Sequence, residues 1–109
     1  MKFNRLSMIM AAAMALAACS QTPAETSLKD AYADSFMIGC AVNPSHTSGR
    51  LEQANELLLT HFNAISPENC LKPEAVQPRP GVWTFEEADE YVQFGEEHDM
   101  WMLGHTLVW

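Results

Sequence analysis

The sequence has few basic residues, and this scarcity excludes one large class of function. Its 109 residues include six Lys and Arg against 14 Asp and Glu. Two of the six, Lys2 and Arg5, lie in the first five positions, so the rest of the chain is strongly acidic. A nucleic-acid-binding protein needs a basic face to meet the phosphates. We therefore expect no nucleic-acid partner.

Cysteine and histidine are also scarce, and their spacing does not suit a metal. The cysteines are Cys19, Cys40 and Cys70, and none of the four histidines lies within four residues of a cysteine or of another histidine. Zinc sites usually take ligands in closely spaced pairs. We expect neither a metal nor another cofactor. Cys40 and Cys70 could form a disulfide or could pack as small apolar side chains, and the sequence leaves both possibilities open.

Long apolar runs are absent beyond the N-terminus, so no spanning helix is expected in residues 19–109. Residues 1–18 instead resemble a bacterial lipoprotein signal: Lys2 and Arg5 come before a Met-, Ala- and Leu-rich stretch that ends in Leu-Ala-Ala before Cys19. The resemblance implies cleavage before Cys19, acylation of this cysteine and a lipid anchor in the cell envelope, with the outer membrane favoured because Ser20 follows. An ordinary secretory signal and an uncleaved apolar helix are the alternatives. Residues 19–27 then form a flexible tether.

Residues 28–109 alternate short apolar runs with amphipathic segments. After a short helix at 28–33, we expect strands at 36–42, 62–66 and 101–105, with helices at about 50–60 and 84–98 between them. The continuous apolar run 36–42 is typical of a strand that is buried on both faces. The order strand, helix, strand, helix, strand predicts a parallel α/β sheet with right-handed crossovers.

The apolar spacing also predicts which helix faces are buried. The inner stripe of the first long helix would consist of Leu51, Ala54, Leu58 and Phe62, and that of the second of Phe85, Ala88, Val92 and Gly95. Thr84 has the residue type of a helix N-cap. The acidic residues between 86 and 97 would form the solvated face of the second helix.

Polar residues follow the strands, where parallel α/β enzymes carry their chemistry. Asn63 lies in the second strand, Glu68, Asn69 and Lys72 come directly after it, and His105 and Trp109 end the third. The intervening loop 67–84 contains Pro73, Pro78, Pro80 and Gly81, which break regular structure, and loops longer than about 12 residues are usually functional. The carboxyl ends of parallel strands meet on one face, so these side chains could share a site for a polyhydroxylated ligand.

Other interpretations of the same residues stay open at this point. Glu68 and Lys72, four positions apart, could form an ion pair on a helix. His105 could be a buried histidine with a satisfied hydrogen bond, and Trp109 could belong to the core as readily as to a sugar platform.

Three separated motifs resemble glycoside hydrolase family 10, whose members are mostly endo-1,4-β-xylanases. Residues 62–72 read FNAISPENCLK, residues 81–89 read GVWTFEEAD, and residues 104–109 read GHTLVW. They occur in the family's order at plausible spacing, and the resemblance covers about residues 36–109. Cys70-Leu71 and Pro73 depart from common family residues, but neither departure replaces a polar site residue.

The resemblance implies a (β/α)8 barrel, of which the chain holds about three strands and two to three helices. It implies that Glu68, Asn69 and Lys72 bind sugar units on the non-reducing side of the cleaved bond. His105 and Trp109 would shape the cleavage subsite, and the peptide bond between His105 and Thr106 would be cis. The family's two catalytic glutamates follow the fourth and seventh strands, so we assign no catalytic residue to this chain and expect it to be an inactive fragment.

Three functions compete at this stage. The favoured one is a retaining endo-1,4-β-xylanase that hydrolyses internal bonds of xylan. The second is a non-catalytic glycan-binding envelope lipoprotein, and the third is a structural lipoprotein that shares only the fold. The choice between xylan and β-glucan, the face of the outer membrane and the oligomeric state stay open.

Overall fold

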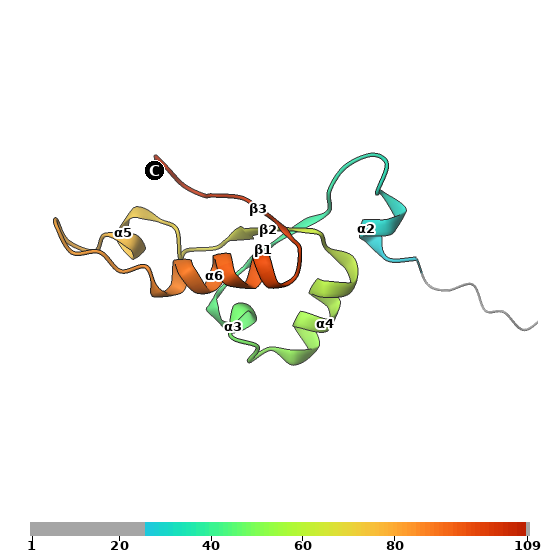
Figure 1. Cartoon of the computed structure of the whole chain (residues 1–109), viewed down its shortest axis with the longest axis horizontal. Helices are drawn as coiled ribbons and strands as arrows, with labels where there is room; N and C mark the ends of the chain where they lie inside the picture. Colours follow the sequence, from blue (N-terminus) through green and yellow to red (C-terminus); the bar gives the residue numbers. More distant parts are fainter. Residues whose placement is uncertain (1–25, 109) are drawn as a thin grey trace, which may run out of the picture.

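The structure, a computed structural model, describes residues 26–108. They form one sheet in the order β1 (Gly39–Val42), β2 (Ala64–Pro67) and β3 (Trp101–Met102). The helices are α2 (Leu28–Ala31), α3 (Pro44–Thr47), α4 (Glu52–His61), α5 (Pro73–Val76) and α6 (Glu86–Glu97) (Figure 1). The predicted signal at 1–18, the lipidation site Cys19, most of the tether and Trp109 lie outside the described residues. Within residues 26–108, no helix is long and apolar enough to cross a membrane.

The predicted parallel sheet is confirmed. Cys40 of β1 pairs with Ile65 of β2, which in turn pairs with Met102 of β3. Because side chains alternate along a strand, these three residues share one face, on which Ile65 belongs to the apolar core and Cys40 and Met102 pack against it. The buried members of that core are Val42, Leu58, Ile65, Cys70, Tyr91, Phe94 and Met100.

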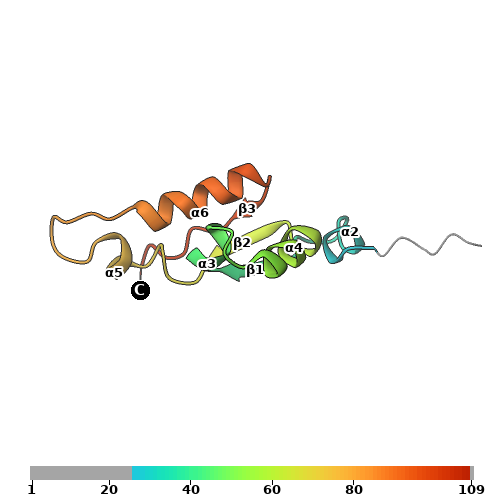
Figure 2. The ribbon, with the colours of Figure 1, turned by 90° about the horizontal axis from the view of Figure 1, so that it is seen from below.

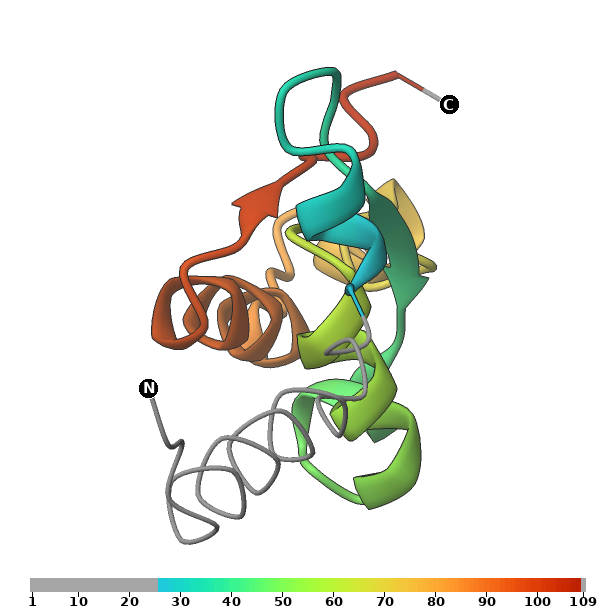
Figure 3. The same ribbon diagram turned by 90° about the vertical axis from the view of Figure 1, so that its right-hand side faces the viewer.

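The helices α3, α4 and α6 lie on one side of this sheet (Figures 1 and 3). No described element covers the opposite face, where Gly39, Ala41 and Trp101 are exposed, Trp101 by 52%. The prediction that residues 36–42 are buried on both faces is therefore wrong for the described chain. The strand is also shorter than expected, since it begins at Gly39 and leaves Phe36 and Met37 each 57% exposed.

The buried face of α6 differs from the prediction. Ala88 and Gly95 are buried as expected, but Tyr91 and Phe94 take the places expected for Phe85 and Val92. Residues 88, 91 and 95 share one stripe, and Gly95 permits close contact because a Cβ there would lie 2.5 Å from Met102 Cγ. In α4 the expected Leu58 is buried, whereas Leu51 comes before the first turn and is exposed.

The loop between β2 and α6 is more regular than its prolines suggest. Pro73 is the first residue of α5, where a backbone N–H has no acceptor within the helix. Its lack of an N–H therefore costs no helical hydrogen bond. The expected N-cap role of Thr84 is wrong: its hydroxyl donates to the Ala75 carbonyl, and Phe85 is the N-cap residue. Thr84 thus ties the end of the loop back to α5.

Two contacts fix the amino ends of the strands. Asn63 Oδ1 accepts a hydrogen bond from Ile38 N (2.8 Å), while its carbonyl accepts from Trp101 N (2.9 Å). Asn63 therefore joins all three strands at the edge opposite Glu68, and it does not belong to the polar cluster after the strands.

Helix α2 packs near the same amino-end edge. Lys29 Nζ donates to the Leu59 carbonyl at 2.6 Å, and Leu28 N donates to His61 Nδ1 at 3.2 Å. Both acceptors belong to the last turns of α4, directly before β2. Figures 1 and 2 accordingly show α2 and α5 at opposite ends of the long axis of the described structure.

Candidate functional site

The polar cluster predicted after β2 lies at the carboxyl-end edge of the sheet. Glu68 follows the last residue of β2, and its backbone N–H donates to the Val42 carbonyl at the end of β1 (2.9 Å). This bond continues the parallel ladder one residue beyond the strand. Glu68 and Asn69 are both exposed at this edge.

The side chains of the cluster are hydrogen-bonded. Glu68 Oε2 accepts from Asn43 Nδ2 at 3.1 Å, and Asn69 Oδ1 accepts from Lys72 Nζ at 3.0 Å. Lys72 has an extended backbone as the residue before α5, and its N–H donates to the Asn69 carbonyl in a turn. Glu68 and Lys72 therefore share no helix, and the alternative of an ion pair along a helix is wrong.

The segment after β3 reaches the same edge. Thr106 N donates to the Leu71 carbonyl at 3.4 Å, which brings the end of the third strand against the loop that carries Lys72. The peptide bond between His105 and Thr106 is cis, as the family resemblance implies. His105 is half-buried there. Trp109, the other residue predicted from this segment, lies outside the described residues.

The edge offers a carboxylate, an amide, an ammonium and an imidazole from two neighbouring strand ends. These groups supply both hydrogen-bond donors and acceptors, which suits a ligand with several hydroxyls. In residues 26–108, no group of three or more His, Cys, Asp or Glu side chains could hold a metal ion.

Sequence reasoning missed two residues that support this edge. Asn43 is the N-cap of α3, and the sequence Asn-Pro-Ser, which is a typical start of a helix, is the signal that could have identified it. Tyr91 was omitted from the buried face of α6. The contact between Asn43 and Glu68 depends on the β1–β2 register and has no local signal in the sequence.

Tyr91 links the interior of β2 to the residue directly after β3. Its phenol OH lies 2.9 Å from the Ile65 carbonyl and 3.1 Å from the Leu103 carbonyl, and these two acceptors share its single proton. The Ile65 carbonyl also accepts from Leu103 N at 2.9 Å. Tyr91 is 2% exposed, and burial raises its pKa to about 12. Tyr91 therefore holds the chain at Leu103, two residues before His105, although its own side chain is buried.

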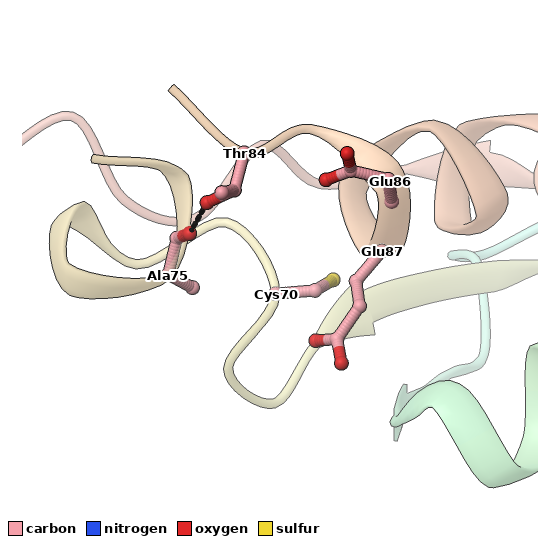
Figure 4. Close-up of a pocket in the computed structure, with 5 residues that line it drawn as sticks. All are labelled: Cys70, Ala75, Thr84, Glu86 and Glu87. Atoms are coloured by element: carbon pink, nitrogen blue, oxygen red, sulfur yellow. Dashed lines mark hydrogen bonds between the residues drawn. The ribbon is translucent and has the colours of Figure 1, made fainter. Parts of the chain in front are cut away.

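A pocket of about 440 Å³ lies beside this edge, between the loop and α6 (Figure 4). Its lining consists of Cys70, Ala75, Thr84, Glu86 and Glu87, so it contains none of the predicted sugar-binding residues. Burial, and then the charge of Glu87, raise the pKa of the Cys70 thiol, which makes it a poor nucleophile. Cys70 and Cys40 are both free thiols that pack against the core, so the packing alternative is confirmed for them.

The comparisons with known proteins agree on one family. The model of Glycosyl hydrolase family 10 matches residues 27–109. Endo-1,4-beta-xylanase A of Halalkalibacterium halodurans is 45% identical over 83 residues, which are 76% of this chain and 20% of that protein. A thermostable celloxylanase of Thermoclostridium stercorarium is 42% identical over 91 residues, which are 82% of this chain and 23% of that protein.

Solved structures give the same result. The crystal structure of xylanase B from Clostridium stercorarium F9 matches with a TM-score of 0.70 and 42% identity, over 76% of this chain and 24% of that one. A mutant structure in complex with xylotriose matches with a TM-score of 0.69 and 36% identity, over the same shares. The three parallel strands thus correspond to part of a (β/α)8 barrel, and the chain spans 20% and 23% of the length of the two curated relatives.

The pKa of Tyr91 predicts a loss of stability at alkaline pH. The raised pKa means that the folded state favours the neutral phenol. This stabilisation is complete below about pH 10, the ordinary pKa of a tyrosine. It disappears as the pH rises towards about 12. Tyr91→Phe cannot ionise. The advantage of the parent chain over Tyr91→Phe in urea midpoint should therefore shrink above pH 9 and reverse sign before pH 11.5, because each pKa unit corresponds to about 1.4 kcal/mol.

Tyr32→Phe provides the matched control, because Tyr32 lies exposed on the surface. It should leave the alkaline loss unchanged. At neutral pH, Tyr91→Phe should cost about 1 kcal/mol through the lost hydrogen bonds. A constant difference between the parent and Tyr91→Phe across this pH range would contradict the assignment.

Proposed function

The chain belongs to Glycosyl hydrolase family 10, and on that premise we propose that it forms part of an endo-1,4-β-xylanase. The observation that carries this proposal is the hydrogen-bonded edge of Glu68, Asn69 and Lys72, against which the His105 segment packs. The names of the relatives support it, because a protein called an endo-1,4-beta-xylanase is 45% identical over this segment.

Each predicted side chain has a role that its chemistry suits. The Glu68 carboxylate accepts hydrogen bonds from sugar hydroxyls, the Lys72 ammonium donates them, and the Asn69 amide can do both. These groups bind the xylose units on the non-reducing side of the cleaved bond. His105 and Trp109 shape the subsite where cleavage takes place, and the indole offers a flat apolar face to a sugar ring.

The proposed reaction is a double displacement with net retention. One carboxylic acid protonates the leaving glycosidic oxygen while a carboxylate about 5–5.5 Å away attacks the anomeric carbon and forms a glycosyl ester. The first residue then takes a proton from water, and the water oxygen breaks the ester. Both residues belong to strands four and seven of the family's barrel, beyond residue 109. The 109-residue chain alone therefore cannot carry out either step.

A hybrid barrel tests this division of labour. Residues 27–109 should replace the matching segment of the Halalkalibacterium halodurans xylanase, and the hybrid should hydrolyse xylan with retention at the anomeric carbon. The isolated chain should release no reducing sugar. Hydrolysis by the isolated chain would overturn its proposed inactivity. A well-folded hybrid that binds xylotriose without cleaving xylan would overturn the enzymatic role.

The gene itself distinguishes the enzyme from a glycan-binding lipoprotein. Reading the DNA past the codon for Trp109 should reveal enough further residues to complete a barrel of about 250 residues. It should also reveal a glutamate after each of the fourth and seventh strands. A complete barrel without these glutamates would favour the glycan-binding protein.

Glu68 provides the direct test of the binding edge. In the hybrid, Glu68→Gln should lower kcat/KM for xylotetraose about tenfold or more, because a hydrogen bond to a charged acceptor contributes about 1.5–3 kcal/mol. Glu52→Gln is the matched control, since Glu52 lies exposed in the first turn of α4. Equal activity of the two variants would favour a protein that shares only the fold.

The envelope location is a second proposal, supported by the sequence alone. Cleavage before Cys19 and acylation of its thiol would hold the protein on a bilayer through several acyl chains, each buried methylene adding about 0.8 kcal/mol. The expressed protein should incorporate a fatty-acid label, and the labelled protein should be found in the membrane fraction. Cys19→Ser should abolish both the label and the membrane fraction. Labelling of the Cys19→Ser variant would contradict lipidation at this residue.

A further inference from the structure

Asn43 links the end of β1 to Glu68 and lies at the start of α3. Its Oδ1 accepts from Ser45 N at 3.0 Å, and its own N–H donates to His46 Nδ1 at 3.3 Å. The two bonds form a capping box, which fixes both the backbone and the side chain of Asn43.

The short helix that holds Asn43 is itself fixed from two directions. Thr47 Oγ1 donates to Glu90 Oε1 of α6 at 2.5 Å. Asn55 Nδ2 of α4 donates to the His46 carbonyl at 2.7 Å. Asn43 is therefore held by α3, and α3 is held by both long helices.

The Ser45 N–H favours one orientation of the Asn43 amide, in which Oδ1 also lies 3.1 Å from His46 Nδ1. Its oxygen is occupied by the Ser45 N–H, so a flip of the amide would replace an accepting atom with a donating one at that position. The NH2 group consequently faces Glu68, whose Oε2 lies 3.1 Å from Nδ2. The Glu68 backbone N–H donates to the carbonyl of Val42, which is the last residue of β1 and directly precedes Asn43. Glu68 is thus held at two points by consecutive residues of one strand end.

We propose that Asn43 is a positioning residue for substrate binding, which fixes the Glu68 carboxylate so that a sugar hydroxyl can donate to it. This inference rests on the proposed xylanase function. A donor at Oε2 defines the plane of the carboxylate and so defines the direction of its second oxygen. A carboxylate that is held in its binding geometry loses less rotational freedom when substrate arrives.

The effect belongs to binding and not to bond cleavage. Neither Asn43 nor Glu68 takes part in proton transfer or in attack on the anomeric carbon. Loss of the Asn43 donor should therefore raise the KM and the xylotriose dissociation constant while kcat stays nearly constant. A role in capping α3 would instead act through stability, so the two roles can be separated.

Two substitutions separate the donor from the cap. Asn43→Ser keeps a good N-cap oxygen and removes the donor to Glu68, whereas Asn43→Ala removes both. We expect both variants to raise the KM for xylotetraose about three- to tenfold, with kcat within about twofold, because each loses one hydrogen bond. Only Asn43→Ala should lower the urea midpoint. The variants are made in the full-length protein, or in the hybrid barrel where the reading frame ends at Trp109.

Ser48→Ala is the matched control, because the Ser48 hydroxyl donates to the Pro44 carbonyl within α3 and not to Glu68. It should leave KM unchanged. In a Glu68→Ala background, Asn43→Ser should have no further effect on the xylotriose dissociation constant, since the acceptor is gone. A KM effect in Asn43→Ala but not in Asn43→Ser would overturn the inference in favour of capping. An equal effect of Asn43→Ser with and without Glu68 would also overturn it.

The readouts distinguish this inference from the function on which it rests. Parent protein that hydrolyses xylan but shows no change on Asn43→Ser overturns the role of Asn43 alone. Parent protein that neither binds xylotriose nor hydrolyses xylan overturns both. Parent protein that binds xylotriose without cleavage overturns the enzymatic role, and the dissociation constants of the variants then decide the role of Asn43.

Discussion

The parallel register of β2 between β1 and β3 is the constraint on which the described structure depends. Ile65 occupies its centre: its side chain packs in the core, and its carbonyl accepts from both Leu103 N and Tyr91 OH. A slip by one residue would turn Ile65 out of the core and would move Glu68 away from the Val42 carbonyl. The same pairing therefore stabilises the fold and assembles the polar edge.

Much of this arrangement could be predicted from the sequence, and the failures have identifiable physical causes. The strand order and the gathering of Glu68, Asn69, Lys72 and His105 follow from local apolar runs and from the geometry of parallel strands. The buried face of α6 depends on what it packs against, so Tyr91, whose ring is apolar and whose OH is polar, could not be assigned from spacing alone. Burial of 36–42 on both faces likewise requires a covering element that residues 26–108 do not supply.

In the proposed enzyme, recognition and bond cleavage come from different stretches of one barrel. The first three strand ends supply groups that hold sugar hydroxyls, and later strands supply the reacting carboxylates. Asn43 adds a layer behind the contact residues, because it acts on substrate only through Glu68. Substitutions in this part of the chain should consequently have a larger effect on the choice of sugar that binds than on the cleavage of the bond.

The attachment of α2 to the last turns of α4 fixes the place on the molecule at which the described chain begins. The hydrogen bonds from Lys29 and Leu28 hold the start of the described chain at the amino ends of the strands, away from Glu68. The point at which a bead or a fused partner could be linked ahead of residue 26 is thus on the side opposite the polar edge. In the proposed enzyme, attachment at that point would leave the polar edge accessible to a polymeric substrate.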